Sequence, residues 1–195
     1  MFVRTENFRQ FIHYYPAVTV LLAINIAVYL LLLLPFVGDV LYAYGVGING
    51  AILEGEVWRL ITPIFMHAGL THFLFNTFAI FIFAPALELL LGRFKFIFLF
   101  LAAGLAGNVA TLLLGSPMMA YLGASGALYG LLGLYLYMIL FRKELIDPAS
   151  RQVVTVMLII GLIYTVLWPN INLYAHLFGF LSGLALGPVL LRKIG

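Results

Sequence analysis

Two residues in separate apolar segments carry side chains that could act together as a nucleophile and a base. Ser125 lies in the run Gly123-Ala124-Ser125-Gly126 at the start of one segment, and His176 lies just inside the start of another. A serine hydroxyl is a weak nucleophile until a base within hydrogen-bond reach takes its proton, and an imidazole suits that task. The pair predicts hydrolytic chemistry inside a membrane, as in a protease that works below the lipid surface.

The composition indicates that membrane helices must position this pair. Of the 195 residues, 65% are hydrophobic and 9% are charged, and the mean hydropathy is +1.14. Apolar runs of spanning length occur at about residues 16–36, 67–88, 94–114, 125–141, 153–168 and 173–191. We therefore predict an all-α, polytopic bundle of six transmembrane helices. Residues 1–195 form a single domain, with a short cytoplasmic or interfacial lead at 1–15 and an outer first loop at 37–66.

Basic residues orient this bundle, because positively charged loops stay on the cytoplasmic side. Of the ten basic residues, all but Arg59 fall on one side if both termini are cytoplasmic. These nine are Arg4, Arg9, Arg93, Lys95, Arg142, Lys143, Arg151, Arg192 and Lys193. The net charge of +3 therefore reflects topology and predicts no nucleic-acid partner. The absence of cysteine excludes disulfides and thiol nucleophiles.

The predicted topology collects several polar residues at one depth. The second, fourth and sixth segments run inward from the outer side, and their first turns hold His67, His72, Asn76, Ser125 and His176. Buried polar groups in membranes are costly and indicate function. Close approach of the fourth and sixth segments requires small residues four apart, which occur at Gly126 and Gly130 and at Gly179, Gly183 and Gly187.

The second segment offers donors for a developing oxyanion. His72 and Asn76 are four residues apart and share a helix face, and Ser125 opens a helix with a free backbone N–H. His67 is five residues from His72, so a regular helix would not direct both at one metal ion. We expect no metal and no organic cofactor.

No acidic residue lies in the outer half of the last three segments, so a Ser-His dyad is expected instead of a triad. Tyr129, one turn after Ser125, is expected to hold the imidazole by stacking. Asn108 is expected to make an interhelical hydrogen bond, and Glu88 to stabilise a loop or a helix cap.

Together these residues resemble the rhomboid intramembrane serine proteases, in their minimal six-helix form. The resemblance rests on motifs in the family's order and spacing over about residues 16–191: Trp58-Arg59, His67 with His72 and Asn76, Gly123-x-Ser125-Gly126 with Tyr129, and Ala175-His176-x-x-Gly179-x-x-x-Gly183.

The resemblance implies a serine endopeptidase that cleaves membrane-protein substrates, single-span or polytopic, near the outer face of the bilayer. Ser125 would be the nucleophile and His176 the general base, with His72, Asn76 and the Ser125 N–H as oxyanion donors and Gly123 shaping the oxyanion hole. Gly126, Gly179 and Gly183 would support the dyad by close packing, and Tyr129 would pack on His176. Trp58 and Arg59 would have a structural role in the first loop, and residues 168–173 would form a cap.

These assignments predict an integral protein of a prokaryotic plasma (inner) membrane, with its active site opening to the extracytoplasmic side. His67 has two interpretations, support of the first loop and contact with water entering the site. A transporter would need an acidic relay or an inverted repeat, and a haem bundle would leave the Gly-Ala-Ser-Gly turn without a role. The alternative that stays open is a catalytically inactive rhomboid-like protein that binds membrane proteins for quality control. Oligomeric state is not predicted.

Overall fold

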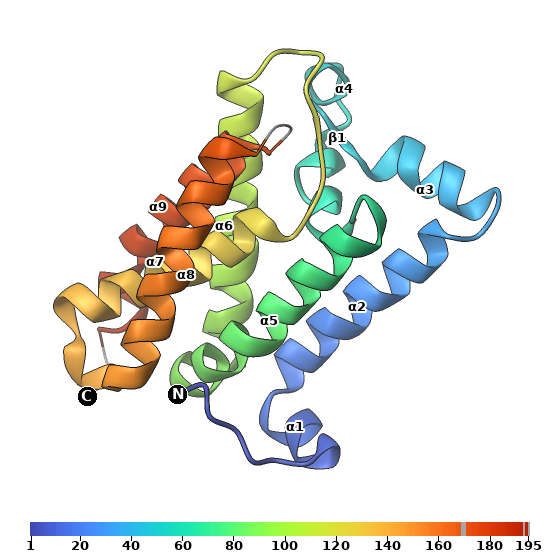
Figure 1. Ribbon diagram of the computed structural model, residues 1–195. Helices are drawn as coiled ribbons and strands as arrows, with labels where there is room; N and C mark the ends of the chain where they lie inside the picture. Colours follow the sequence, from blue (N-terminus) through green and yellow to red (C-terminus); the bar gives the residue numbers. More distant parts are fainter. Residues whose placement is uncertain (169–170, 193, 195) are drawn as a thin grey trace.

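Helices make up nearly all of the regular structure in the computed structural model, which describes residues 1–168, 171–192 and 194 (Figure 1). The longer elements are α1 (Phe8–Tyr14), α2 (Pro16–Leu32), α3 (Val37–Gly45), α4 (Asn49–Leu53), α5 (Gly69–Leu91), α6 (Arg93–Leu114), α7 (Ser125–Phe141), α8 (Pro148–Leu167) and α9 (Leu173–Leu190). Short 3-10 helices are η1 (Val57–Leu60), η2 (Thr62–Phe65) and η3 (Lys143–Leu145), and the strands are β1 (Gly47–Ile48) and β2 (Ala120–Tyr121). The prediction of an all-α membrane protein is therefore confirmed in its fold class.

Within the described residues, four helices are long and apolar enough to span a membrane: α5, α6, α8 and α9. The pair α1 and α2 qualifies as a fifth span when taken together, although the two helices are bent by 109° at their junction. The helix α7 is apolar but has only 17 residues. It starts in the middle of the bundle, because residues 115–124 run back down from the end of α6 before α7 begins (Figure 1).

The helix boundaries follow local signals that hydropathy alone does not contain. The expected segment 153–168 corresponds to α8, which starts at Pro148 because Asp147 caps its first turn by accepting from the Ser150 N–H. The expected segment 16–36 corresponds to α2, which ends at Leu32, three residues before Pro35. The lead at 1–15 contains α1.

The carboxylate of Glu88 caps α2. Its two oxygens accept hydrogen bonds from the backbone N–H groups of Ala17 and Val18, both at 2.8 Å. A carboxylate at a helix N-terminus accepts hydrogen bonds from N–H groups that have no partner within the helix, and its negative charge interacts favourably with the helix dipole. Glu88 is 3% exposed, so this buried carboxylate fixes the start of α2 against the C-terminal half of α5.

Glycines allow α7 and α9 to pack backbone against backbone. A Cβ atom added at Gly179 would lie 2.1 Å from the Gly126 carbonyl oxygen, and one at Gly183 would lie 1.8 Å from the Gly130 carbonyl oxygen. A Cβ at Gly133 would lie 2.1 Å from the Phe180 oxygen. Three successive turns of α7 therefore have no room for side chains at this interface, as expected of small-residue membrane packing.

We predict that Gly183→Ala lowers the thermal stability of the protein in detergent. The new methyl group has backbone, not a flexible side chain, in its path, so the two helices must separate at a cost of about 1–3 kcal/mol or more. Thermal unfolding followed by intrinsic fluorescence measures the change. Ala185→Val, on the exposed face of the same helix, is the control and is expected to leave the midpoint nearly unchanged. Equal midpoints for the two variants would contradict the proposed tight packing.

Candidate active site

Ser125 and His176 form a hydrogen-bonded pair between α7 and α9. Ser125 is the first residue of α7 and His176 is the fourth of α9. The Ser125 Oγ lies 2.8 Å from the Nε2 of His176, within the range of a nucleophile and its base. The imidazole is 6% exposed and is therefore held in one place by its surroundings.

Asn172 sets the residue at which α9 begins, and therefore the position of His176 in its first turn. Its side-chain oxygen accepts from the Ala175 N–H at 3.0 Å and its amide nitrogen donates to the Thr111 hydroxyl on α6 at 2.9 Å. A side-chain N-cap of this kind fixes where a helix begins. The proposed cap segment, residues 168–173, includes residues 169 and 170, which lie outside the described residues.

Two side chains fix the orientation of the His176 ring. Tyr129 stacks on it with ring centroids 4.2 Å apart and an angle of 16° between the ring planes. The hydroxyl of Thr165, on α8, lies 2.8 Å from the Nδ1 of His176. We did not anticipate Thr165 from the sequence, and its signal is weak. Threonines in helices commonly bond to their own backbone, so one threonine in an apolar helix does not stand out.

His72 faces Ser125 across a gap that Gly123 leaves open. A Cβ atom at Gly123 would lie 2.7 Å from the Cε1 and Nε2 atoms of His72 and 3.7 Å from the Ser125 Oγ. The backbone N–H of Ala68 donates to the Nδ1 of His72 at 3.3 Å, so a neutral ring carries its proton on Nε2. That N–H is a donor directed at the space beside Ser125.

Asn76 and His67 lie close to this space. The Asn76 amide nitrogen donates one hydrogen to the His72 carbonyl at 2.9 Å, which leaves its second hydrogen for another acceptor. The His67 ring lies edge-on to that of His72, with centroids 5.2 Å apart, and is 4% exposed. Both ring nitrogens of His67 are buried, and neither has a hydrogen-bond partner among the described residues.

The first loop is held by Arg59, which is 4% exposed. Its guanidinium donates to the carbonyls of Val46 at 2.6 Å and Ala43 at 2.8 Å, and it contacts the Glu56 carboxylate. The Trp58 indole donates to the Tyr44 carbonyl at 3.0 Å. These bonds tie the end of α3 to η1. Trp58 and Arg59 therefore stabilise the first loop, and their hydrogen bonds do not involve Ser125 or His176.

The first loop in turn positions the segment before Ser125. The strands β1 and β2 pair antiparallel, with Gly47 opposite Tyr121, and the Gly123 N–H donates to the Pro63 carbonyl at 2.8 Å. Asn108 on α6 also belongs to this system, because its amide donates to the Leu60 carbonyl at 2.8 Å. The bond expected from Asn108 to another helix is therefore present, but its partner belongs to the short helix η1 of the first loop and not to a membrane-spanning helix, because the loop folds against α6.

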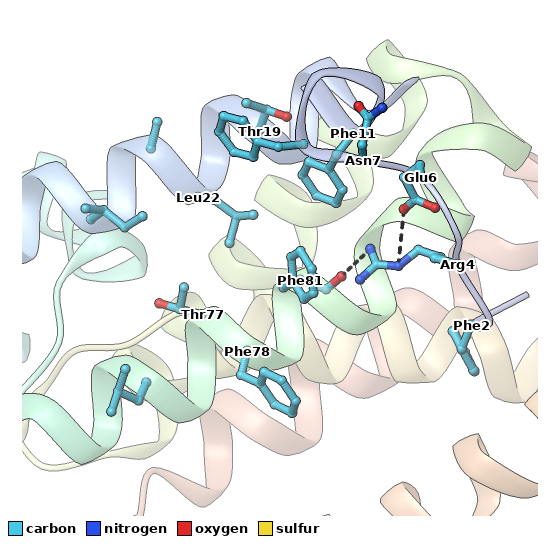
Figure 2. Close-up of a pocket in the computed structure, with 14 residues that line it drawn as sticks. Phe2, Arg4, Glu6, Asn7, Phe11, Thr19, Leu22, Thr77, Phe78 and Phe81 are labelled. Carbon is cyan, nitrogen blue, oxygen red and sulfur yellow. Dashed lines mark hydrogen bonds and ion pairs between the residues drawn. The ribbon is translucent and has the colours of Figure 1, made fainter. Parts of the chain in front are cut away.

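A separate cavity of about 840 Å³ lies between the N-terminal segment, α2 and α5. Figure 2 shows phenylalanines from both sides lining it, with Arg4 bridging the Glu6 carboxylate and the Phe81 carbonyl. Its lining includes Leu74, Thr77 and Phe78 of α5 but, among the described residues, none of the dyad or oxyanion candidates. The size of this apolar groove therefore does not bear on the chemistry at Ser125.

Comparison with known proteins gives consistent results. Residues 54–193 match the Rhomboid domain family. A Bacillus subtilis (strain 168) protein named "Putative rhomboid protease YdcA" is 43% identical over 194 residues, which cover 99% of this chain and 98% of that protein. "Rhomboid protease GluP" of the same organism is 35% identical over 74% of this chain, which corresponds to 28% of the longer relative. "RHOMBOID-like protein 5" of Arabidopsis thaliana is 36% identical over 72% of this chain and 46% of its own length. This chain is a member of the rhomboid family.

Proposed function

We propose that the protein is an intramembrane serine endopeptidase that hydrolyses peptide bonds in or near the transmembrane helices of other membrane proteins. The observation that carries the proposal is the 2.8 Å contact between the Ser125 Oγ and the His176 Nε2, from helices held together by glycines. Two relatives that are named as rhomboid proteases support it.

In the first step, the Ser125 oxygen attacks the carbonyl carbon of the scissile bond while its proton passes to the Nε2 of His176. The carbonyl oxygen becomes an oxyanion. Donors aimed at this position commonly make the largest single contribution to such catalysis. Three N–H groups can supply them: the backbone of Ser125, the Nε2 of His72 and the second amide hydrogen of Asn76.

In the second step, the imidazolium of His176 gives its proton to the leaving amine, and the C–N bond breaks to leave an acyl group on Ser125. Water then attacks the ester, with His176 again as general base, and releases the carboxylate product and the free serine. Every proton moves between Ser125, His176, the substrate and water. The chemistry thus needs no metal or organic cofactor.

The charge distribution supports an orientation for this site. In the proposed topology six helices span the bilayer, both termini are cytoplasmic and the dyad opens to the extracytoplasmic side of a prokaryotic plasma membrane. Two features support termini on one side: the Met1 amino group binds Asp147, and the Arg142 side chain binds the Leu191 carbonyl at 2.8 Å. The N-terminal residue and the end of α9 therefore both contact the segment that connects α7 to α8.

A fluorophosphonate probe tests the proposal, because it reacts with activated serines without a known substrate. We expect the purified protein in detergent to gain one phosphonyl group, which peptide mass spectrometry assigns to Ser125. Ser182→Ala, which removes a second serine from the bundle, is the control and should label like the wild type. A folded wild-type protein that does not react would favour the alternative, an inactive member of the family that binds membrane proteins.

A further inference from the structure

A chain of hydroxyl groups leads away from His176 and ends on a backbone carbonyl. The Nδ1 of His176 lies 2.8 Å from the Thr165 hydroxyl, which lies 2.7 Å from the Tyr129 hydroxyl. The Tyr129 hydroxyl donates to the Gly161 carbonyl at 2.6 Å. Together with the contact between Ser125 and His176, four hydrogen bonds form one continuous series across α7, α8 and α9.

Counting protons fixes the direction of this series. The three contacts beyond the imidazole need three protons, and a carbonyl oxygen can only accept. With the proton on Nδ1, the Nδ1–H, the Thr165 hydroxyl and the Tyr129 hydroxyl supply one proton to each contact. With the proton on Nε2, only the two hydroxyls remain, and one pair of oxygen or nitrogen acceptors would face each other without a proton.

We propose that Thr165, Tyr129 and the Gly161 carbonyl set the tautomer of His176 and so perform the orienting task that an aspartate performs in a Ser-His-Asp triad. Protonation at Nδ1 leaves the lone pair of Nε2 free to accept the Ser125 proton, as a general base requires. The inference rests on the proposed function for its catalytic meaning. Thr165 and Tyr129 are positioning residues, since they act through His176.

The residues around this series of hydrogen bonds leave room for it and shield it from water. A Cβ atom at Gly161 would lie 2.8 Å from the Tyr129 hydroxyl oxygen, so the missing side chain lets the phenol reach the carbonyl. That carbonyl belongs to the residue four before Thr165, to which a helical threonine would ordinarily donate. Here it accepts from Tyr129 instead, which leaves the Thr165 oxygen for the imidazole. Thr165 is 7% exposed, so water does not readily replace these partners.

The test compares Thr165→Val with Thr165→Ser. Valine keeps the shape of threonine but cannot bond to Nδ1, whereas serine keeps the hydroxyl. We expect Thr165→Val to slow fluorophosphonate labelling about 10–100-fold, the size of loss that follows removal of the group that orients a metal-bound histidine. We expect Thr165→Ser to restore most of the rate. Tyr129→Phe keeps the stacked ring and should slow labelling to a smaller extent.

Thr155→Val is the matched control, because Thr155 lies on the same helix and its hydroxyl donates to a backbone carbonyl of that helix, that of Arg151, at 2.9 Å. It should label at the wild-type rate. A general loss of folding in Thr165→Val would appear as a lowered unfolding midpoint that Thr165→Ser does not share, so the midpoints of all four variants are measured alongside.

A second readout does not depend on protease activity. In protein labelled with nitrogen-15 in histidine, NMR distinguishes protonated from unprotonated ring nitrogens, and His176→Ala assigns the His176 signals. We expect protonated Nδ1 in the wild type and a shift of the proton toward Nε2 in Thr165→Val. An unchanged tautomer in Thr165→Val would overturn the inference even if the protein is a protease. The expected shift would support the inference even if the wild type failed to label.

Discussion

Replacing either Ser125 or His176 with alanine is expected to reduce the rate of peptide-bond hydrolysis by about 10⁴-fold or more. Ser125→Ala removes the atom that attacks the carbonyl, and His176→Ala removes the only base within hydrogen-bond distance of that atom among the described residues. The measurement is cleavage of a single-span reporter protein in liposomes, with a small residue at the cut and glycine and proline nearby. Gel analysis over hours and days covers the necessary range of rates.

The double variant provides the internal test of a shared role. If the two side chains act as one unit, Ser125→Ala with His176→Ala should be no slower than either single variant, because the first change already removes the whole dyad mechanism. Rates that multiply in the double variant would instead indicate separate contributions. The control is Ser182→Ala, which removes a serine hydroxyl from α9, away from the Ser125–His176 contact, and is expected to retain wild-type cleavage.

The contact between Ser125 and His176 could be predicted because it depends on short sequence patterns in the two segments. Polar residues lie near the N-terminal ends of three apolar segments, which suggests a shared depth for Ser125 and His176, and glycines four apart allow their helices to touch. The bounds 125–141 expected for the fourth segment are also those of α7. No partner far along the chain is needed to derive these features.

The elements around the dyad depend on contacts that no local pattern contains. Thr165 looks like an ordinary helical threonine until Tyr129 occupies the carbonyl to which it would donate. The strands β1 and β2 have two residues each, too few for a period-2 pattern, and they form because the first loop folds against the segment before Ser125. The pair Asp147-Pro148 is a typical signal for the start of a helix and marks the start of α8. A criterion based on hydropathy misses this start, because the first turn of α8 is polar.

Gly123 is the position where backbone conformation and chemistry depend most directly on each other, and Gly123→Ala is expected to lower hydrolysis by about 10²–10³-fold, the usual effect of losing one oxyanion donor. Its φ of +128° disfavours any side chain, and a new Cβ would lie 2.7 Å from the His72 Nε2, between that donor and Ser125. The methyl group would therefore fill the space that the oxyanion needs or push the imidazole away from it.

Gly55→Ala separates these two effects, because Gly55 has a comparable φ of +111° but open space around its Cβ position. Both variants should lose stability through backbone strain, about 1–3 kcal/mol each. Only Gly123→Ala should lose activity at a temperature where both are folded, and its loss should fall on kcat more than on KM, since an oxyanion exists only after attack begins. Similar activities in the two variants would mean that strain, not the gap beside His72, explains the glycine. A loss confined to Gly123→Ala would assign the gap to the transition state, and with it the direction from which the scissile carbonyl enters.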